Sequence, residues 1–262
     1  MEKECHGLSG EDGNLVNERV SVMQFVNRFM YIMNSLRFSF GRKSFALDEL
    51  DRKAAAYIRR RNGFFVEVGA NDGINQSNTL YFERYLGWCG LLIEPIPELA
   101  EKCRRNRPRC LVENCALVAA DYPEDTIEMR YCNLMSIVKG AMGGGEQEEQ
   151  HIRSGMRFLR ESERVYTVEV PARTLSWVLD KYNVEHIDLL SLDVEGYEEQ
   201  VLKGIDFDRH RPEYMLIEVR RRQSVESIIK PYYTLVDVLQ TNKSYSDVLY
   251  KRLQGCRNGS VS

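Results

Sequence analysis

The chain has 262 residues, 43% of them hydrophobic, and its formal net charge is −3. This length fits one α/β domain with additions, and the slight acidity argues against a nucleic-acid-binding protein, whose phosphate contacts require a basic surface. The first residues lack the apolar region of a signal peptide, and no stretch reaches the ~20 apolar residues of a membrane-spanning helix, so we expect a cytoplasmic protein without a transmembrane segment.

The N-terminal 60 residues predict two helices outside the main domain. Apolar residues recur at helical spacing within residues 14–36, which predicts a helix that packs on the main domain or on a second subunit. A second helix is expected over residues 46–61, where the arginines at 59–61 suit a helix C-terminus and Asn62-Gly63 ends the helix. Residues 1–60 are therefore expected to form a helical extension that offers a surface for homo-oligomer formation.

Residues 61–262 predict one domain in which apolar strands alternate with helices. The expected strands are residues 64–68, 90–93, 110–118, 187–192 and 214–219, and the expected helices are residues 78–86, 97–106 and 198–202. Alternation at this spacing is typical of parallel βαβ units. Near the C-terminus, residues 234–239 and 247–252 flank a turn, which predicts an antiparallel hairpin. The expected fold class is α/β, with a mostly parallel sheet that carries this hairpin at one edge.

A long insertion, at about residues 121–173, separates the third expected strand from the fourth. It contains two strand-like segments, residues 126–131 and 165–170, with a glycine triplet and a charged stretch between them. A long segment inside a compact domain is commonly a lid or a binding loop. The arginines of the charged stretch fit either contact with an anionic ligand or a solvated helix face, and the interspersed glutamates favour the solvated face. A solvated surface position is also expected for His151, although it could serve as a base.

The first strand runs into a glycine-rich loop, residues 67–73 (EVGANDG). Ligands of doubly wound sheets bind outside the carboxyl ends of the strands. Gly69 and Gly73 would let the backbone approach such a ligand closely. The loop lacks the GxGxxG pattern of dinucleotide sites, while Glu67 and Asp72 supply negative charge suited to an ammonium group. Taken alone, the loop fits an ordinary strand-to-helix turn equally well.

The next two strand ends extend this candidate site. Glu94 ends the second strand, where a carboxylate can accept both hydrogen bonds of a ribose diol, so it indicates an adenosine cofactor without saying which one. The third strand ends near Asn114, Cys115 and Ala116, where an adenine base would sit. Ala116 is small enough to border a flat ring and Asn114 could hydrogen-bond to it, although an ordinary strand end fits these residues equally well.

Three carboxylates follow the fourth and fifth strands. Asp193 and Glu195 come directly after the fourth strand, and Glu218 lies near the end of the fifth. Such carboxylates can act as a general base or hold a divalent cation, and Asp193 could also simply cap the next helix. The seven cysteines contain no CxxC pair, so we expect reduced thiols and no zinc site.

The ordered motifs together resemble the FkbM family of S-adenosylmethionine (SAM)-dependent methyltransferases. The segments that carry the resemblance are residues 65–73, 77–79, 90–95, 171–175 and 187–198. The resemblance implies a class I, Rossmann-like methyltransferase fold. It also implies methyl transfer from SAM to a hydroxyl, on acceptors such as sugars, glycans, lipid-linked saccharides or polyketides. No signature in the first 60 residues or in the insertion identifies the acceptor.

We therefore expect a SAM-dependent O-methyltransferase with a sugar or glycan acceptor. The expected cofactor-binding residues are Glu67, Gly69, Ala70, Asn71, Asp72, Gly73, Ser77, Asn78, Glu94, Asn114, Cys115, Ala116 and Asp193. The expected catalytic residues are Asp193, Glu195 and Glu218, acting through a carboxylate base or through a bound divalent cation. The alternatives are methylation of a polyketide, of another small-molecule hydroxyl or of a carboxylate, and a non-catalytic role in trafficking like that of the Star-like animal proteins.

Overall fold

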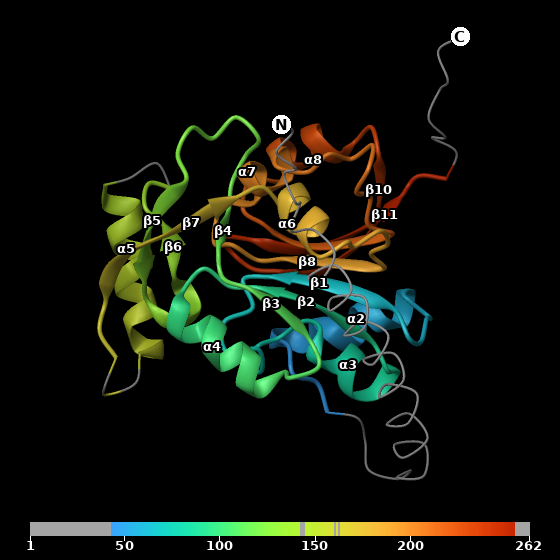
Figure 1. The fold of residues 1–262 in the computed structure, drawn as a ribbon, viewed down its shortest axis with the longest axis horizontal. Coiled ribbons are helices and arrows are strands. Elements are labelled where there is room, and N and C mark those ends of the chain that lie inside the picture. The colour runs from blue at the N-terminus through green and yellow to red at the C-terminus, as the bar shows by residue number, and fades with distance from the viewer. Residues whose placement is uncertain (1–42, 142–144, 160, 162, 255–262) are drawn as a thin grey trace, which may run out of the picture.

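The computed structural model describes residues 43–141, 145–159, 161 and 163–254 (Figure 1). Its main sheet has seven strands in the order β10-β11-β9-β8-β1-β2-β3. These strands are β1 (Phe64–Val68), β2 (Cys89–Ile93), β3 (Leu111–Glu113), β8 (Leu189–Leu192), β9 (Tyr214–Val219), β10 (Tyr233–Thr241) and β11 (Ser246–Arg252). Strands β3, β2, β1, β8 and β9 are parallel, whereas β11 runs antiparallel to both β9 and β10. This is the predicted Rossmann-like arrangement, including the C-terminal hairpin.

Helices cover both faces of the main sheet, because each strand alternates the direction of its side chains. On one face, Phe65 and Leu92 pack with α2 (Leu50–Tyr57), α3 (Leu80–Leu86) and part of α4 (Pro97–Asn106). On the other face, Val66 and Leu91 pack with α6 (Leu175–Lys181), α7 (Glu198–Lys203) and α8 (Arg222–Ile229). Figure 1 shows these two helical layers on opposite sides of the strands. Burial of each such apolar side chain contributes about 1.5–3 kcal/mol.

The predicted insertion forms most of a second, smaller sheet with strand order β4-β7-β5-β6. Its elements are β4 (Ala116–Leu117), β5 (Thr126–Tyr131), β6 (Ile137–Val138), β7 (Tyr166–Arg173), α5 (Glu146–Gly155) and the 3-10 helices η2 (Asn133–Met135) and η3 (Met156–Phe158). A separate apolar core joins this sheet to Ile96 and Leu99 at the start of α4. The insertion is thus packed against the main domain beside the carboxyl end of β2.

The third expected strand is in fact two strands in different sheets, so the prediction of one strand over residues 110–118 was wrong. Asn114 interrupts it, because its side-chain amide donates to the carbonyl oxygens of Glu94 and Pro95 at 2.9 and 2.8 Å. The chain after Asn114 then pairs with β7 instead of β2. As a result, Asn114 and Cys115 connect the two sheets, and Ala116 begins β4 of the smaller sheet.

Two helix predictions also need correction. The expected helix over residues 46–61 is only α2, preceded by the 3-10 helix η1 (Leu47–Glu49), and the arginines at 59–61 follow it. Asp48 and Glu49 have positive φ angles, which separate η1 from α2. The sequence pattern did not predict α6 or α8. The helix expected within residues 14–36 lies outside the described residues.

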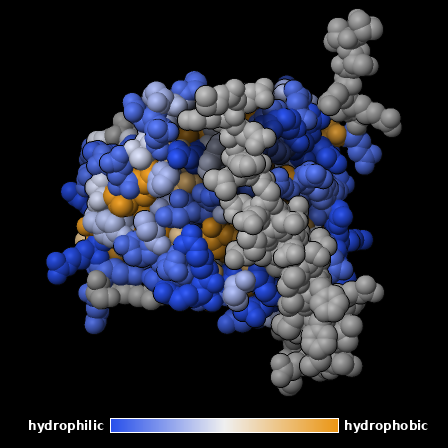
Figure 2. All heavy atoms as spheres, in the orientation of Figure 1, coloured by the Kyte–Doolittle hydropathy of each residue, from blue (hydrophilic) through white to orange (hydrophobic). Residues whose placement is uncertain are grey.

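Hydrophilic residues cover most of the coloured surface in Figure 2, with apolar residues in small groups between them. The large apolar side chains that are exposed come from separate elements, such as Leu47 in η1, Trp177 in α6 and Leu235 in β10. Within the described residues, no helix combines the length and apolarity needed to cross a bilayer.

Candidate active site

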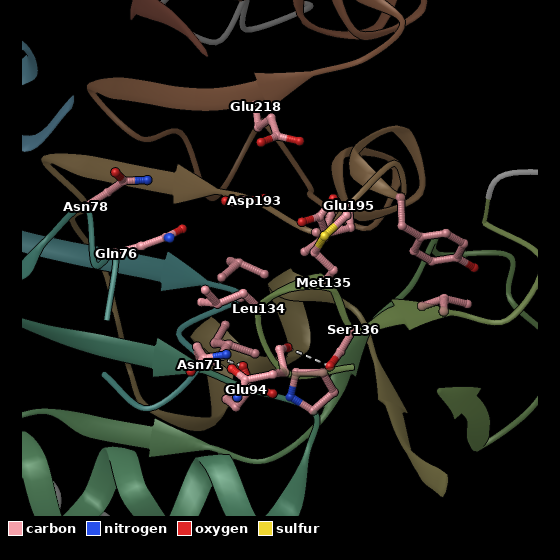
Figure 3. A pocket seen from close by; sticks show the side chains of 18 of the residues that line it. Asn71, Gln76, Asn78, Glu94, Leu134, Met135, Ser136, Asp193, Glu195 and Glu218 are labelled. Atoms are coloured by element: carbon pink, nitrogen blue, oxygen red, sulfur yellow. Dashed lines mark hydrogen bonds between the residues drawn. The ribbon is translucent and has the colours of Figure 1, made fainter. Parts of the chain in front are cut away.

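A pocket of about 350 Å³ lies at the carboxyl ends of β1, β2, β8 and β9. The order of the sheet reverses here, because the chain leaves β1 toward β2 and β3 and later returns to β8 on the other side of β1. Figure 3 shows Asn71 and Glu94 at one end of this pocket and Asp193, Glu195 and Glu218 at the other. The pocket therefore brings together residues from four strand ends that are far apart in the sequence.

The loop after β1 lies close to the loop after β8. Gly69 has a φ of 82°, and a Cβ atom on it would lie 1.9 Å from the carbonyl oxygen of Asp193. Asn71 also has a positive φ, of 49°, which asparagine tolerates better than most residues. Gly69 is therefore required for the approach of the two loops, and both Gly69 and Asn71 line the pocket.

Glu94 is buried at the tip of β2, and both of its carboxylate oxygens accept a backbone hydrogen bond. Oε2 accepts from the Asn71 N–H at 2.8 Å, and Oε1 accepts from the Ile96 N–H at 2.9 Å. Each oxygen retains a second lone pair, so Glu94 can still accept hydrogen bonds from a ligand in the pocket. Burial raises the pKa of Glu94 to about 7, although the two backbone N–H groups oppose this shift. Cys115 and Ala116 line the pocket too.

Glu67, a predicted cofactor residue, does not line the pocket. Its buried carboxylate accepts hydrogen bonds from the Ser77 hydroxyl at 2.9 Å, the Asn78 backbone N–H at 2.8 Å and the Thr79 hydroxyl at 2.6 Å. Ser77 does not line the pocket either. Asn78 does line the pocket, and its side-chain amide donates a hydrogen bond to the Ser191 hydroxyl at 3.1 Å. Glu67 thus fixes the segment that presents Asn78.

Four other predicted cofactor residues support the pocket from outside its wall: Ala70, Asp72, Gly73 and Asn114. Asp72 Oδ1 accepts the backbone N–H groups of Ile74 and Asn75 at 2.9 and 2.8 Å, which closes the turn after the loop. The side-chain bonds of Asn114 hold the chain that follows Glu94. Asp72 and Asn114 therefore hydrogen-bond within the protein and shape the loops around the pocket without lining it.

Sequence reasoning missed Arg107, which is fully buried behind the loop. Its guanidinium forms ion pairs with Glu83 and with Glu67, and it donates to the carbonyl oxygen of Gly73 at 3.1 Å. A buried cation is tolerated only when it is paired and hydrogen-bonded in this way. No sequence signal identifies Arg107, because it stands among other arginines near the end of α4 and its partners are distant in the chain.

Four carboxylates line the other end of the pocket with one arginine among them. Arg220 hydrogen-bonds to Glu195, and its Nη2 lies 3.2 Å from Glu218 Oε1. Asp247 on β11 lies directly across from Glu218 on β9, and Asp193 completes the group. Sequence reasoning missed Arg220 and Asp247. The spacing of Glu218 and Arg220 could have indicated that both face the same side of a strand end.

One arginine cannot balance four carboxylates, of which Glu218 and Asp247 are buried and Asp193 and Glu195 half-buried, so their pKa values rise. Burial and the charge of Asp193 raise the pKa of Glu195 to about 8, although Arg220 opposes this shift. Burial, followed by the charges of Asp193 and Glu195, raises the pKa of Glu218 to about 11. Burial also raises the pKa of Asp193, and it raises that of Asp247 to about 7. Glu218 therefore keeps its proton near neutral pH, whereas Glu195 titrates close to the physiological range.

Glu195 has a further unusual feature, a backbone φ of 54°. Residues other than glycine rarely adopt this conformation, and such strain concentrates at functional sites. His151 of α5 lies beside it, with Nε2 3.7 Å from Glu195 Oε2. The expectation of a solvated His151 was wrong, because the side chain is buried and its Nε2 lies 3.2 Å from the Met135 carbonyl oxygen. Burial, together with the charge of Arg220, lowers the pKa of His151 to about 4.

The carboxylates of the pocket do not form a compact metal-ligand set. Within the described residues, the one group of three whose ligand atoms lie within 4.8 Å of one another is His186, Asp188 and Glu213. This group is near the amino end of β8, and Arg60 already forms an ion pair with Asp188 at 2.5 Å. The geometry gives no support to a divalent cation at Asp193, Glu195 and Glu218.

The insertion supplies one wall of the pocket. Leu134 and Met135 of η2 lie between the two ends of the pocket in Figure 3. Arg157 and Phe158 of η3 line the pocket as well. The insertion thus contributes residues of η2 and η3 to the wall of the pocket. Arg157 of η3 lines the pocket, whereas Arg153 of α5 does not.

A family profile for the methyltransferase FkbM domain matches residues 67–245, which is more than half of the chain. The chain belongs to the FkbM family of methyltransferases. The matched residues include those that line both ends of the pocket, from Val68 to Tyr245. Of the pocket's carboxylates, Asp247 alone lies beyond the matched residues. A comparison with curated proteins finds no match.

Solved structures similar to this FkbM chain have low sequence identity to it, and several of them are methyltransferases. A TehB-like SAM-dependent methyltransferase from Corynebacterium glutamicum is 9% identical, covers 89% of this chain and 99% of its own, and has a TM-score of 0.39. An O-methyltransferase from Bacillus cereus in complex with SAH is 12% identical, covers 94% of this chain and 93% of its own, and has a TM-score of 0.40. Aeropyrum pernix fibrillarin with bound SAM is 12% identical, covers 82% of this chain and 84% of its own, and has a TM-score of 0.41.

The proton on Glu218 has a measurable consequence for the stability of the FkbM domain. An unfolded glutamate loses its proton above a pH of about 4, whereas folded Glu218 keeps its proton up to a pH of about 11. Between these values the folded state binds more protons, so its stability falls as the pH rises. We expect Glu218→Gln to remove this cost, so that its melting temperature exceeds that of the wild type by an amount that grows from pH 6 to pH 9.

Thermal denaturation at several pH values tests this prediction. Glu185→Gln is the matched control, because Glu185 is exposed just before β8 and its loss should not alter the slope of melting temperature against pH. Parallel curves for Glu218→Gln and the wild type would show that Glu218 is not held in its neutral form.

Proposed function

We propose that this FkbM-family protein is a SAM-dependent O-methyltransferase that methylates a hydroxyl of a sugar or glycan. The observation that carries the proposal is the continuity of the pocket, which joins a buried carboxylate suited to a ribose at one end to a carboxylate with a near-neutral pKa at the other. A cofactor and an acceptor could therefore occupy one shared space.

The residues at the Glu94 end fit an adenosine cofactor. Glu94 has free lone pairs for two ribose hydroxyls, and Cys115 and Ala116 border a space beside it with their small side chains. Asp193 and the acidic residues around it would suit the positive charge of a sulfonium and an ammonium group. When bound, SAM supplies an electrophilic methyl group.

Glu195 is the best placed of the three predicted catalytic carboxylates to act as the base. Glu218 keeps its proton near pH 7. The backbone N–H of Asp193 is bound to the carbonyl oxygen of Val68, the last residue of β1, at 3.2 Å. Glu195 lies on the far side of Met135 from the Glu94 end of the pocket, as Figure 3 shows. Its carboxylate would accept the proton of the acceptor hydroxyl while Arg220 holds its orientation.

The rim of the pocket supports a polyhydroxylated acceptor. Asn75, Gln76 and Asn78 bring three side-chain amides to its lining, and each amide can both donate and accept hydrogen bonds. Tyr245 adds an aromatic face near the acidic end. Such a combination matches the alternating hydroxyls and apolar C–H faces of a sugar ring better than it matches a wholly apolar chain.

A transfer assay with methyl-labelled SAM tests this proposal. The panel should contain nucleotide sugars, sugar phosphates, glucuronides, neutral oligosaccharides, and a polyketide alcohol and a carboxylic acid for comparison. We expect base-stable label on at least one saccharide, because an ether survives mild alkali whereas a methyl ester does not. Label found only on the polyketide or the acid would overturn the sugar acceptor. SAM binding without any transfer would support a non-catalytic role.

A further inference from the structure

Arg157 is placed in the pocket by the insertion, and no ion pair joins it to a carboxylate among the residues that the structure describes. It lies in η3, it is exposed, and it lines the pocket beside Phe158. Its guanidinium carbon lies 4.7 Å from the centre of the Phe158 ring, which keeps the planar group extended along an aromatic face. Within the described residues, Arg157 forms no ion pair, so this contact leaves its hydrogen-bond donors available.

The other arginines near the pocket have carboxylate partners. Arg220 is bound to Glu195, and Arg130 of the small sheet forms ion pairs with Glu148 and Glu149 at 3.2 and 2.7 Å. Their charges are thus compensated within the protein. Arg157 differs from both, because it lines the pocket and no described side chain balances its charge.

Close packing fixes η3 in this position. Gly155 immediately precedes η3, and a Cβ atom on it would lie 2.8 Å from both Cys132 Sγ and Met135 Cβ. Glycine at this position therefore lets the end of α5 lie directly against η2. Met135 lines the pocket near Glu195, as Figure 3 shows. The packing thus holds η3, and Arg157 with it, against η2, whose Met135 lines the pocket near Glu195.

We propose that Arg157 binds an anionic group, a phosphate or a carboxylate, carried by the saccharide acceptor. This inference rests on the proposed function and narrows its substrate class from sugars in general to charged sugars, such as nucleotide sugars, sugar phosphates and uronic acids. A guanidinium can bind the oxygens of either group through two parallel hydrogen bonds, which gives orientation as well as affinity. An anion held at η3 would direct the rest of the acceptor toward Glu195.

The test compares wild type, Arg157→Gln and Arg157→Lys, with Arg153→Gln as the matched control. Arg153 is an exposed arginine on α5 of the same insertion, and it does not line the pocket. Titration calorimetry in the presence of SAH measures binding of UDP-glucose, glucuronate and glucose. We expect Arg157→Gln to weaken UDP-glucose or glucuronate binding by at least about 10-fold, Arg157→Lys to weaken it less, and Arg153→Gln to bind as the wild type does. The comparison of UDP-glucose with glucuronate separates phosphate from carboxylate.

Kinetics with the acceptors found by the transfer assay give an independent readout. The ratio of kcat/KM for charged over neutral saccharides should fall in Arg157→Gln mainly through KM, and should be retained in Arg153→Gln. Equal binding of the charged probes by wild type and Arg157→Gln, or an unchanged ratio, would overturn the role of Arg157. SAM binding is measured separately, so that its absence counts against the proposed function while the UDP-glucose and glucuronate titrations still decide on Arg157.

Discussion

Glu195→Gln is expected to lower the rate of methyl transfer by about 10²–10⁴-fold at pH 8, while the affinity for SAM changes by less than about threefold. Glutamine keeps the size of the side chain and one oxygen that can accept a hydrogen bond from Arg220, but it cannot accept a proton from the acceptor hydroxyl. The two readouts are single-turnover transfer of labelled methyl and calorimetric titration of SAM. They separate loss of the base from loss of the cofactor site.

The pH dependence gives a second readout for the same residue. The pKa of Glu195 is raised to about 8, and the base is active only in its deprotonated form. The rate of the wild type should therefore rise with pH through about 8 and then level off, and Glu195→Gln should lack this rise. Glu199→Gln is the control, because Glu199 lies on the adjacent α7, pairs with Arg221 and does not line the pocket. Turnover by Glu195→Gln within about fivefold of the wild type would exclude Glu195 as the base.

Glu94→Gln is expected to weaken SAM binding by about 100-fold or more. Hydrogen bonds to a charged group contribute about 1.5–3 kcal/mol each, and about 1.4 kcal/mol corresponds to a tenfold change in affinity. The substitution replaces one carboxylate oxygen with an amide group that donates instead of accepting. Because the pKa of Glu94 is raised to about 7, SAM should also bind the wild type more tightly at pH 8 than at pH 6.

A control must separate this effect from damage to the loop, because Glu94 also accepts the N–H groups of Asn71 and Ile96. Melting temperature measured without ligand reports the structural cost directly. Glu113→Gln is the matched variant, since Glu113 ends the neighbouring strand, binds Lys181 and Tyr182 at 2.7 Å, and does not line the pocket. If Glu94→Gln and Glu113→Gln bound SAM equally well, Glu94 would not be the ribose ligand.

The sequence was sufficient to predict the main sheet, because buried parallel strands are short apolar runs between helices. The bounds of β1, β9 and α4 agree with the expected residues, and the C-terminal hairpin was placed correctly. The expected third strand failed because the side chain of Asn114 interrupts the strand through tertiary hydrogen bonds. Periodicity in the sequence contains no information about bonds of that kind.

The candidate site was only partly predictable, for a similar reason. The residues that line the pocket at strand ends, such as Glu94, Asp193 and Glu195, follow from the rule that ligands bind at the carboxyl ends of parallel strands. Carboxylates such as Glu67 fit the same rule, but their hydrogen-bond partners within the protein become visible only in three dimensions. Arg107 was missed because its role depends on contacts between residues that are distant in the chain.

Calorimetric titration of SAM into the purified wild-type protein tests the central claim most directly. The pocket predicts binding of one SAM per chain, competition by SAH, and a rise in melting temperature with SAM concentration as binding to the folded state requires. Glu94→Gln should weaken all three effects. Absence of both binding heat and thermal stabilisation in the wild type would contradict the assignment of this pocket as a SAM site.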